Sequence, residues 1–239
     1  MRSELEAAVD DLYRVFGRYQ LLEGVEYCDH CVDPEQVEAL HRTPLRHVTA
    51  EQLGPLLFKS TTTWGDQRYL NHFMPRLLEL VAAGEMNDWS YPTFLPSRLA
   101  GLWRSGSPDE RRVISDFAWA WWRETTSTWP SFCEPREVLD TIAECGQNVS
   151  PYLAAWPVHA GKPAALQLAE LVSDLLASSR QDNGFRREAT DWMSGPIPAD
   201  VLTAEVSATA DPDIARQLSD VFEHLALWRQ SQTSTTTKR

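Results

Sequence analysis

Hydrophobic residues recur at three- and four-residue steps along most of this chain, which is the spacing of an α-helix. In the first segment Leu5, Val9, Leu12 and Phe16 fall on one stripe, and the pattern predicts a helix that ends near Gly24. Strict alternation of apolar and polar residues, which marks a half-buried strand, does not recur. The pattern therefore predicts an all-α protein without a sheet.

Several prolines stand where a helix begins, directly after a polar residue that can cap the first turn. Asp33-Pro34, Ser107-Pro108 and Asp211-Pro212 have this form, and residues 49–52 make a capping box without proline. Four further prolines precede stretches of helical period: Pro135, Pro151, Pro163 and Pro198. These signals predict about eight to eleven helices of modest length, arranged as stacked antiparallel pairs in an irregular domain.

One domain over residues 1–230 is expected, with a candidate seam at 129–135 and a disordered polar tail at 231–239. Pro75 lies inside a helical run, so the helix is expected to kink or restart there. The ten tryptophans are expected mainly in the core, since large aromatic side chains dominate cores; an aromatic binding groove is the alternative.

The chain carries 34 acidic against 22 basic residues, a formal charge of -12. Such a charge repels phosphate backbones and anionic lipid heads, which argues against nucleic-acid and membrane partners. It suits either a well-solvated surface or an acidic face that meets a basic protein. The acidic N-terminus does not read as a signal peptide, and no stretch approaches the ~20 apolar residues of a membrane span, so a cytoplasmic location is expected.

The sharpest local motif is Cys28-Asp29-His30-Cys31, followed by His41 and His47. Thiolate and imidazole ligands at such spacings are typical of tetrahedral zinc. The interval between Cys31 and His41 is shorter than that of a zinc finger, and Pro44 separates the histidines, so Cys133 or Cys145 could complete the site instead. The alternative is a pair of thiols that only pack at a helix junction.

A second cluster of chemistry-bearing residues follows a threonine run. If Asp66 caps the next helix, then His72, Arg76 and Glu79 fall near one face of it. Together with Trp64 they could bind an anion or transfer a proton, or they could be a salt-bridged, solvated helix face. The chain lacks a glycine-rich phosphate loop, a GxSxG elbow and an HExxH pair.

The segments YCDHCVDPEQ, TTTWGD, HFMPRLLEL, PYLAAW, LQLAELV and WMSGPIPADVL resemble a family of uncharacterised bacterial helical proteins of actinobacterial type, over most of the chain. The residues that match its motifs are Cys28, Cys31, Trp64, Gly65, Asp66, His72, Phe73, Pro75 and Arg76. The chain departs from the family's pattern at Met74, where leucine is commoner, and at Gln167, where a histidine often stands. The resemblance implies candidate residues and no activity.

Charge, helical architecture and the missing catalytic motifs favour a non-enzymatic scaffold that binds a protein partner, as an acidic immunity or regulatory factor would. The alternative is a zinc-binding protein that uses Cys28, Cys31, His41 and His47, or an enzyme with an anion site at Asp66, His72 and Arg76.

Overall fold

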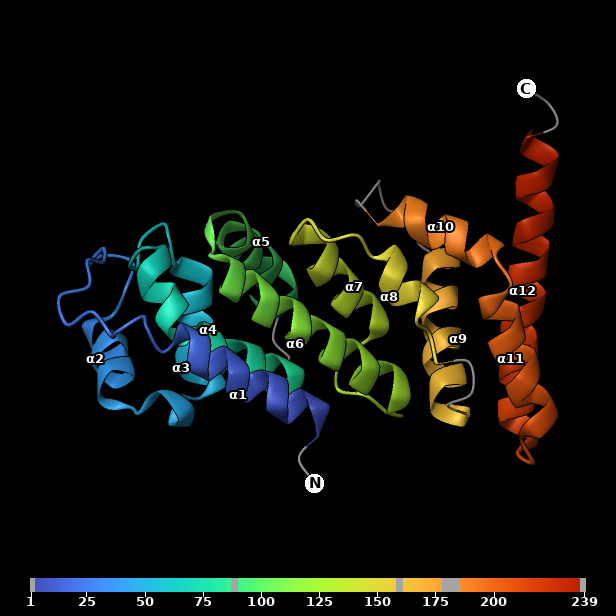
Figure 1. The fold of residues 1–239 in the computed structure, drawn as a ribbon, viewed down its shortest axis with the longest axis horizontal. Helices are drawn as coiled ribbons and strands as arrows, with labels where there is room; N and C mark the ends of the chain where they lie inside the picture. The colour runs from blue at the N-terminus through green and yellow to red at the C-terminus, as the bar shows by residue number, and fades with distance from the viewer. Residues whose placement is uncertain (1–2, 87–89, 158–160, 178–184, 237–239) are drawn as a thin grey trace. The chain divides into compact units, whose positions relative to one another are not determined.

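The protein is helical throughout the part of the chain that the structure describes. The computed structural model describes residues 3–86, 90–157, 161–177 and 185–236 (Figure 1). Within these ranges it has twelve α-helices, one 3-10 helix and no strand, apart from two isolated bridges that involve Trp64. The predicted all-α class is therefore confirmed. None of the helices in these ranges combines the length and the apolar composition needed to cross a bilayer.

The chain divides into two compact units. The first comprises Met1–Trp121 with Glu144–Gly146, and the second comprises Trp122–Ala143 with Gln147–Arg239. The sequence predicts one domain over residues 1–230, with a seam at 129–135. The division instead falls inside a helix, between Trp121 and Trp122.

The first unit is built around one long helix. Its elements are α1 (Glu4–Phe16), α2 (Pro34–Arg42), η1 (Leu45–His47), α3 (Ala50–Lys59), α4 (Gln67–Ala82), α5 (Ser90–Ser105) and the first part of α6 (Pro108–Ser127). α4 packs against α1, α3, α5 and η1, and its buried residues include Leu70, Phe73, Leu77 and Val81. α4 therefore supplies the centre of this unit's core.

The second unit contains the rest of α6 and six further helices. They are α7 (Pro135–Glu144, whose last residue belongs to the first unit), α8 (Ser150–Ala154), α9 (Lys162–Ala177), α10 (Arg186–Ser194), α11 (Ile197–Ala208) and α12 (Pro212–Thr236). α9, α11 and α12 pack against one another, and α10 packs against α8 and α11. The Trp156 ring contacts the Trp122 ring edge to face and the Trp192 ring at a tilt, with centroid distances of 5.3 and 5.6 Å.

The helix starts agree with the capping residues. Asp33 caps α2 through the Glu35 amide, and the capping box of Thr49 with Gln52 opens α3. Ser107 and Glu110 exchange the two hydrogen bonds of a capping box at the start of α6. A local signal at each start was therefore sufficient to predict these helices.

Helix continuity differs from the prediction at three places. α1 ends at Phe16 rather than near Gly24, because the chain turns at Gly17 and the Tyr19 ring packs on the Phe16 ring. α4 continues as a helix through Pro75 and so does not restart there, because packing of the buried proline offsets the lost backbone hydrogen bond. α12 continues to Thr236, since adding residues to an established helix costs little; residues 237–239 of the expected tail lie outside the described residues.

Candidate functional site

Two segments far apart in the sequence are joined by backbone hydrogen bonds in the first unit. The amide of Cys28 donates to the carbonyl of Thr63 at 2.8 Å, and the amide of Gly65 donates to the carbonyl of Glu26 at 2.9 Å. Tyr27 and Trp64 face each other in the resulting antiparallel bridge. The bridge fixes residues 26–28 against residues 63–65.

The segment after α3 is held in a constrained conformation. Thr61 has a φ of 61°, in the left-handed region that a β-branched residue rarely adopts. The Arg98 guanidinium donates to the Thr61 hydroxyl at 2.8 Å, and the amides of Thr63 and Trp64 both donate to the Lys59 carbonyl. Such strained residues persist only where surrounding contacts determine them.

Gly65 occupies a position that only glycine suits. Its φ is 65°, and a Cβ atom built there would lie 2.7 Å from the Cδ1 atom of Tyr69. The Tyr69 ring cannot move aside easily, because both Tyr69 and Trp64 are fully buried. The turn into α4 therefore depends on the missing side chain.

Gly65→Ala is expected to destabilise the protein by about 1–3 kcal/mol, because it adds left-handed strain to a steric clash. Gly24→Ala is the matched control: a Cβ at Gly24 has no atom within 4 Å, and its φ is not left-handed. Urea unfolding followed by circular dichroism measures both. Equal stability of the two variants would contradict this reading of the turn.

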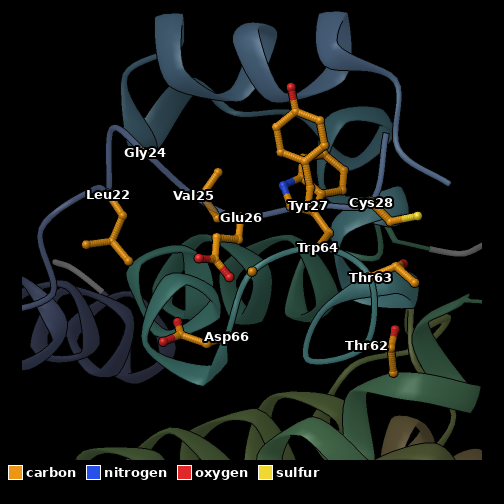
Figure 2. Close-up of a pocket in the computed structure, with 11 residues that line it drawn as sticks. Leu22, Gly24, Val25, Glu26, Tyr27, Cys28, Thr62, Thr63, Trp64 and Asp66 are labelled. Carbon is orange, nitrogen blue, oxygen red and sulfur yellow. The ribbon is translucent and has the colours of Figure 1, made fainter. Parts of the chain in front are cut away.

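The two joined segments enclose a pocket of about 530 Å³. Its lining residues are Leu22, Gly24, Val25, Glu26, Tyr27, Cys28, Thr62, Thr63, Trp64, Gly65 and Asp66. Figure 2 shows the carboxylates of Glu26 and Asp66 on the same side of the pocket, below the Trp64 side chain. No lysine, arginine or histidine of the described chain lines this pocket, so its walls carry only negative charge.

The predicted binding residues separate into two groups. Trp64 and Asp66 line the pocket, and Asp66 also caps α4 by accepting the Tyr69 amide at 2.8 Å, as expected. His72 and Arg76 do not line it. Glu26 did not stand out in the sequence, because it belongs to no motif there.

His72 and Arg76 are both engaged in contacts that join helices. His72 lies with Nδ1 2.7 Å from the Tyr19 carbonyl, so Nδ1 must carry the proton that is donated. The Arg76 Nε donates to the Val48 carbonyl at 2.8 Å, and its Nη1 donates to Glu79 at 2.8 Å. A guanidinium that already has a carboxylate partner is less able to bind a second anion.

Glu79 also accepts a hydrogen bond from the Tyr13 hydroxyl at 2.6 Å. Burial and this carboxylate raise the pKa of Tyr13. The Arg46 guanidinium lies 3.8 Å above the centre of the Tyr13 ring and pairs with Asp10 at 2.7 Å. The contacts tie α1 to α4 and η1, which is a structural role.

The candidate zinc ligands are only partly brought together. Cys28 and Cys31 share one turn, and both are exposed. The Nε2 atom of His41 lies 3.1 Å from the Tyr69 hydroxyl, and His47 ends η1. In the described ranges no three His, Cys, Asp or Glu side chains form a group that could hold a metal ion.

The environment of His41 differs from that of a surface histidine. Burial and the neighbouring His72 lower the pKa of His41, against a smaller effect of Glu23. Burial also raises the pKa of Tyr69 to about 12, against a smaller effect of the Trp64 side chain. The Tyr69 hydroxyl therefore stays protonated. The contact of His41 with this hydroxyl is part of the packing of the first unit. Zinc at Cys28 and Cys31 stays a prediction.

No family model, curated protein or solved structure matches the chain. A function must therefore be proposed from the geometry of the pocket and its rim.

Proposed function

We propose that this protein is a non-enzymatic scaffold that binds a protein partner by taking one of its cationic side chains into the pocket between residues 22–28 and 62–66. The observation that carries the proposal is the pair of carboxylates, Glu26 and Asp66, in a pocket without a basic lining residue. An arginine or lysine side chain supplies the missing opposite charge.

The dimensions of the pocket support this proposal. A volume of about 530 Å³ falls in the range of sites that enclose a small ligand or one long side chain. The hydroxyls of Thr62 and Thr63 can accept hydrogen bonds from a guanidinium, and the Tyr27 and Trp64 rings offer apolar surface to its methylene stem.

An exposed aromatic side chain close in the sequence supports a protein partner. Phe58, near the end of α3, is 43 % exposed, and its ring meets the Phe94 ring edge to face at 4.8 Å. Exposed aromatic residues beside charged ones are enriched where proteins bind each other. The net charge of -12 favours a basic partner, and four free cysteines suit the cytoplasm.

The proposal is tested with a labelled short peptide that contains two arginines, and with the same peptide in which citrulline replaces arginine. Citrulline keeps the shape of the side chain and removes its charge. Fluorescence anisotropy at low salt should show about tenfold tighter binding of the arginine peptide, as two exposed ion pairs of up to about 1 kcal/mol each allow. The difference should vanish at about 1 M salt, where charges are screened beyond about 3 Å.

The double variant Glu26→Gln, Asp66→Asn should bind both peptides equally. Asparagine at 66 keeps the helix cap, so the fold should be retained. Its matched control is Glu35→Gln, Glu51→Gln, which removes two exposed charges from first turns of the same unit. If both double variants lose the preference equally, the effect is net charge alone and the pocket is not the binding site.

A further inference from the structure

The Cys28–Cys31 turn brings two exposed thiols together on the surface of the first unit. The amides of Cys31 and Val32 both donate to the Cys28 carbonyl at 2.9 Å, which closes the turn. The first and fourth residues of a tight turn have Cα atoms within about 7 Å, a separation that a disulfide can span. The Cys28 amide is held in turn by the Thr63 carbonyl at 2.8 Å.

The surroundings of Cys28 favour its thiolate. Hydrogen bonding by the His30 and Cys31 backbone and by the Cys31 side chain lowers the pKa of Cys28, against smaller effects of desolvation and Asp29. The same contact raises the pKa of Cys31. Figure 2 shows the Cys28 sulfur pointing away from Glu26 and Trp64, at the edge of the pocket. The exposed Cys28 sulfur can therefore meet a disulfide from solution.

The other two cysteines provide an internal contrast. Cys133 and Cys145 are buried, and burial raises the pKa of Cys145 to about 12. Neither is a surface nucleophile. The paired arrangement belongs to Cys28 and Cys31 alone among the four free thiols, all of which the structure describes.

We propose that Cys28 and Cys31 are a redox-active dithiol that reduces an exposed disulfide of another molecule and becomes a Cys28–Cys31 disulfide. The Cys28 thiolate attacks one sulfur of the disulfide, which forms a mixed disulfide and releases the other sulfur as a thiolate that takes up a proton. Cys31 then loses its proton and attacks the Cys28 sulfur, which releases the second thiol. One disulfide is reduced to two thiols while the protein loses two hydrogens.

The probe for the test is 2-hydroxyethyl disulfide, which carries no charge. Its reaction therefore does not depend on the acidic pocket, and failure here is distinguishable from failure of cation binding. The reduced full-length protein should yield an intramolecular Cys28–Cys31 disulfide, seen by mass spectrometry of the peptide that contains both residues. Cys133 and Cys145 should remain thiols under the same conditions.

Single variants distinguish the two roles. Cys31→Ser keeps a hydroxyl that can donate to Cys28, and it should accumulate a stable mixed disulfide at Cys28. Cys28→Ser should form its mixed disulfide at Cys31, and neither single variant can form the internal disulfide. Both cysteines are exposed, so circular dichroism should show unchanged folds.

Three results would overturn the proposal. The first is a wild-type product with two separate mixed disulfides and no internal bond. The second is oxidation of Cys133 and Cys145 at the same rate as the Cys28–Cys31 pair. The third is about one equivalent of zinc in protein purified without chelator, lost in the Cys28→Ser, Cys31→Ser variant, because bound metal would make the pair structural.

Discussion

Trp122→Ala is expected to lower the free energy of unfolding of the second unit by about 3–5 kcal/mol, the cost of removing a large buried aromatic side chain. Trp122 is fully buried, its Nε1 donates to the Tyr152 carbonyl at 2.8 Å, and its ring meets Trp156 edge to face. The variant loses the packing of the ring and the hydrogen bond from its Nε1 atom to Tyr152. Both losses act in the same direction.

Two further variants identify the cause. Trp122→Phe keeps much of the ring and removes the donor, so its cost should be about 1–3 kcal/mol. Glu124→Ala, an exposed position of the same helix, should change stability by no more than about 0.5 kcal/mol. Urea unfolding followed by near-ultraviolet dichroism measures all three. A Trp122→Ala cost as small as that of Glu124→Ala would show that this stack of indoles does not stabilise the unit.

Glu110→Ala is expected to destabilise the first unit by about 2–3 kcal/mol near neutral pH, since it removes hydrogen bonds made by a buried charged group. The Glu110 side chain is only 1 % exposed and pairs with Arg18 at 2.7 Å. It also accepts from the Ser107 amide at 2.6 Å, in the capping box of α6. One carboxylate therefore serves both the helix start and a contact with the segment after α1.

The same residue predicts how stability changes with pH. Burial pushes the pKa of Glu110 upward, but hydrogen bonds from Tyr19 and Ser107 and the Arg18 charge outweigh burial and lower it. A carboxyl with a depressed pKa in the folded state contributes stability that is complete above its unfolded value of 4.5 and is lost as pH falls through the folded value. The wild-type protein should therefore lose this contribution below about pH 4.5.

The comparison variant is Glu110→Gln, which keeps the shape of the side chain without an ionisable proton. Its deficit in unfolding free energy relative to the wild type should be largest near neutral pH and should shrink on acidification to about pH 3. Asp109→Asn, an exposed neighbour in the same turn, is the control and should track the wild type. A deficit for Glu110→Gln that is constant across this range would contradict the assignment.

Local chemistry made most of the helices predictable. A cap and a proline act within one turn, so the starts of α2, α3, α6 and α12 could be located from adjacent residues. Ends were harder. α1 stops at Phe16 because the residues after it make tertiary contacts instead of helical ones. One such contact is the hydrogen bond of the Tyr19 carbonyl with His72.

The pocket could not be predicted, because its walls come from two segments that meet only in the folded chain. Cys28 and Asp66 each stood out through a local motif, yet no pattern in the sequence pairs Glu26 with Gly65. The periodicity that placed His72 and Arg76 on one face was sound, but it could not show that Tyr19, Val48 and Glu79 already engage them. The sequence does not show which distant residues contact these side chains.

The bridge between residues 26–28 and 63–65 makes the pocket less resistant to partial unfolding than the Cys28–Cys31 turn. Only contacts between distant residues hold the pocket walls together, whereas the thiol turn closes on itself within a few residues. Partial unfolding of the first unit would therefore separate the two pocket walls before it opens the Cys28–Cys31 turn. Breaking a contact between distant residues releases more chain entropy than opening a short turn. At temperatures just below the melting transition, Cys28 and Cys31 would therefore still reduce a disulfide when the pocket no longer binds a basic peptide.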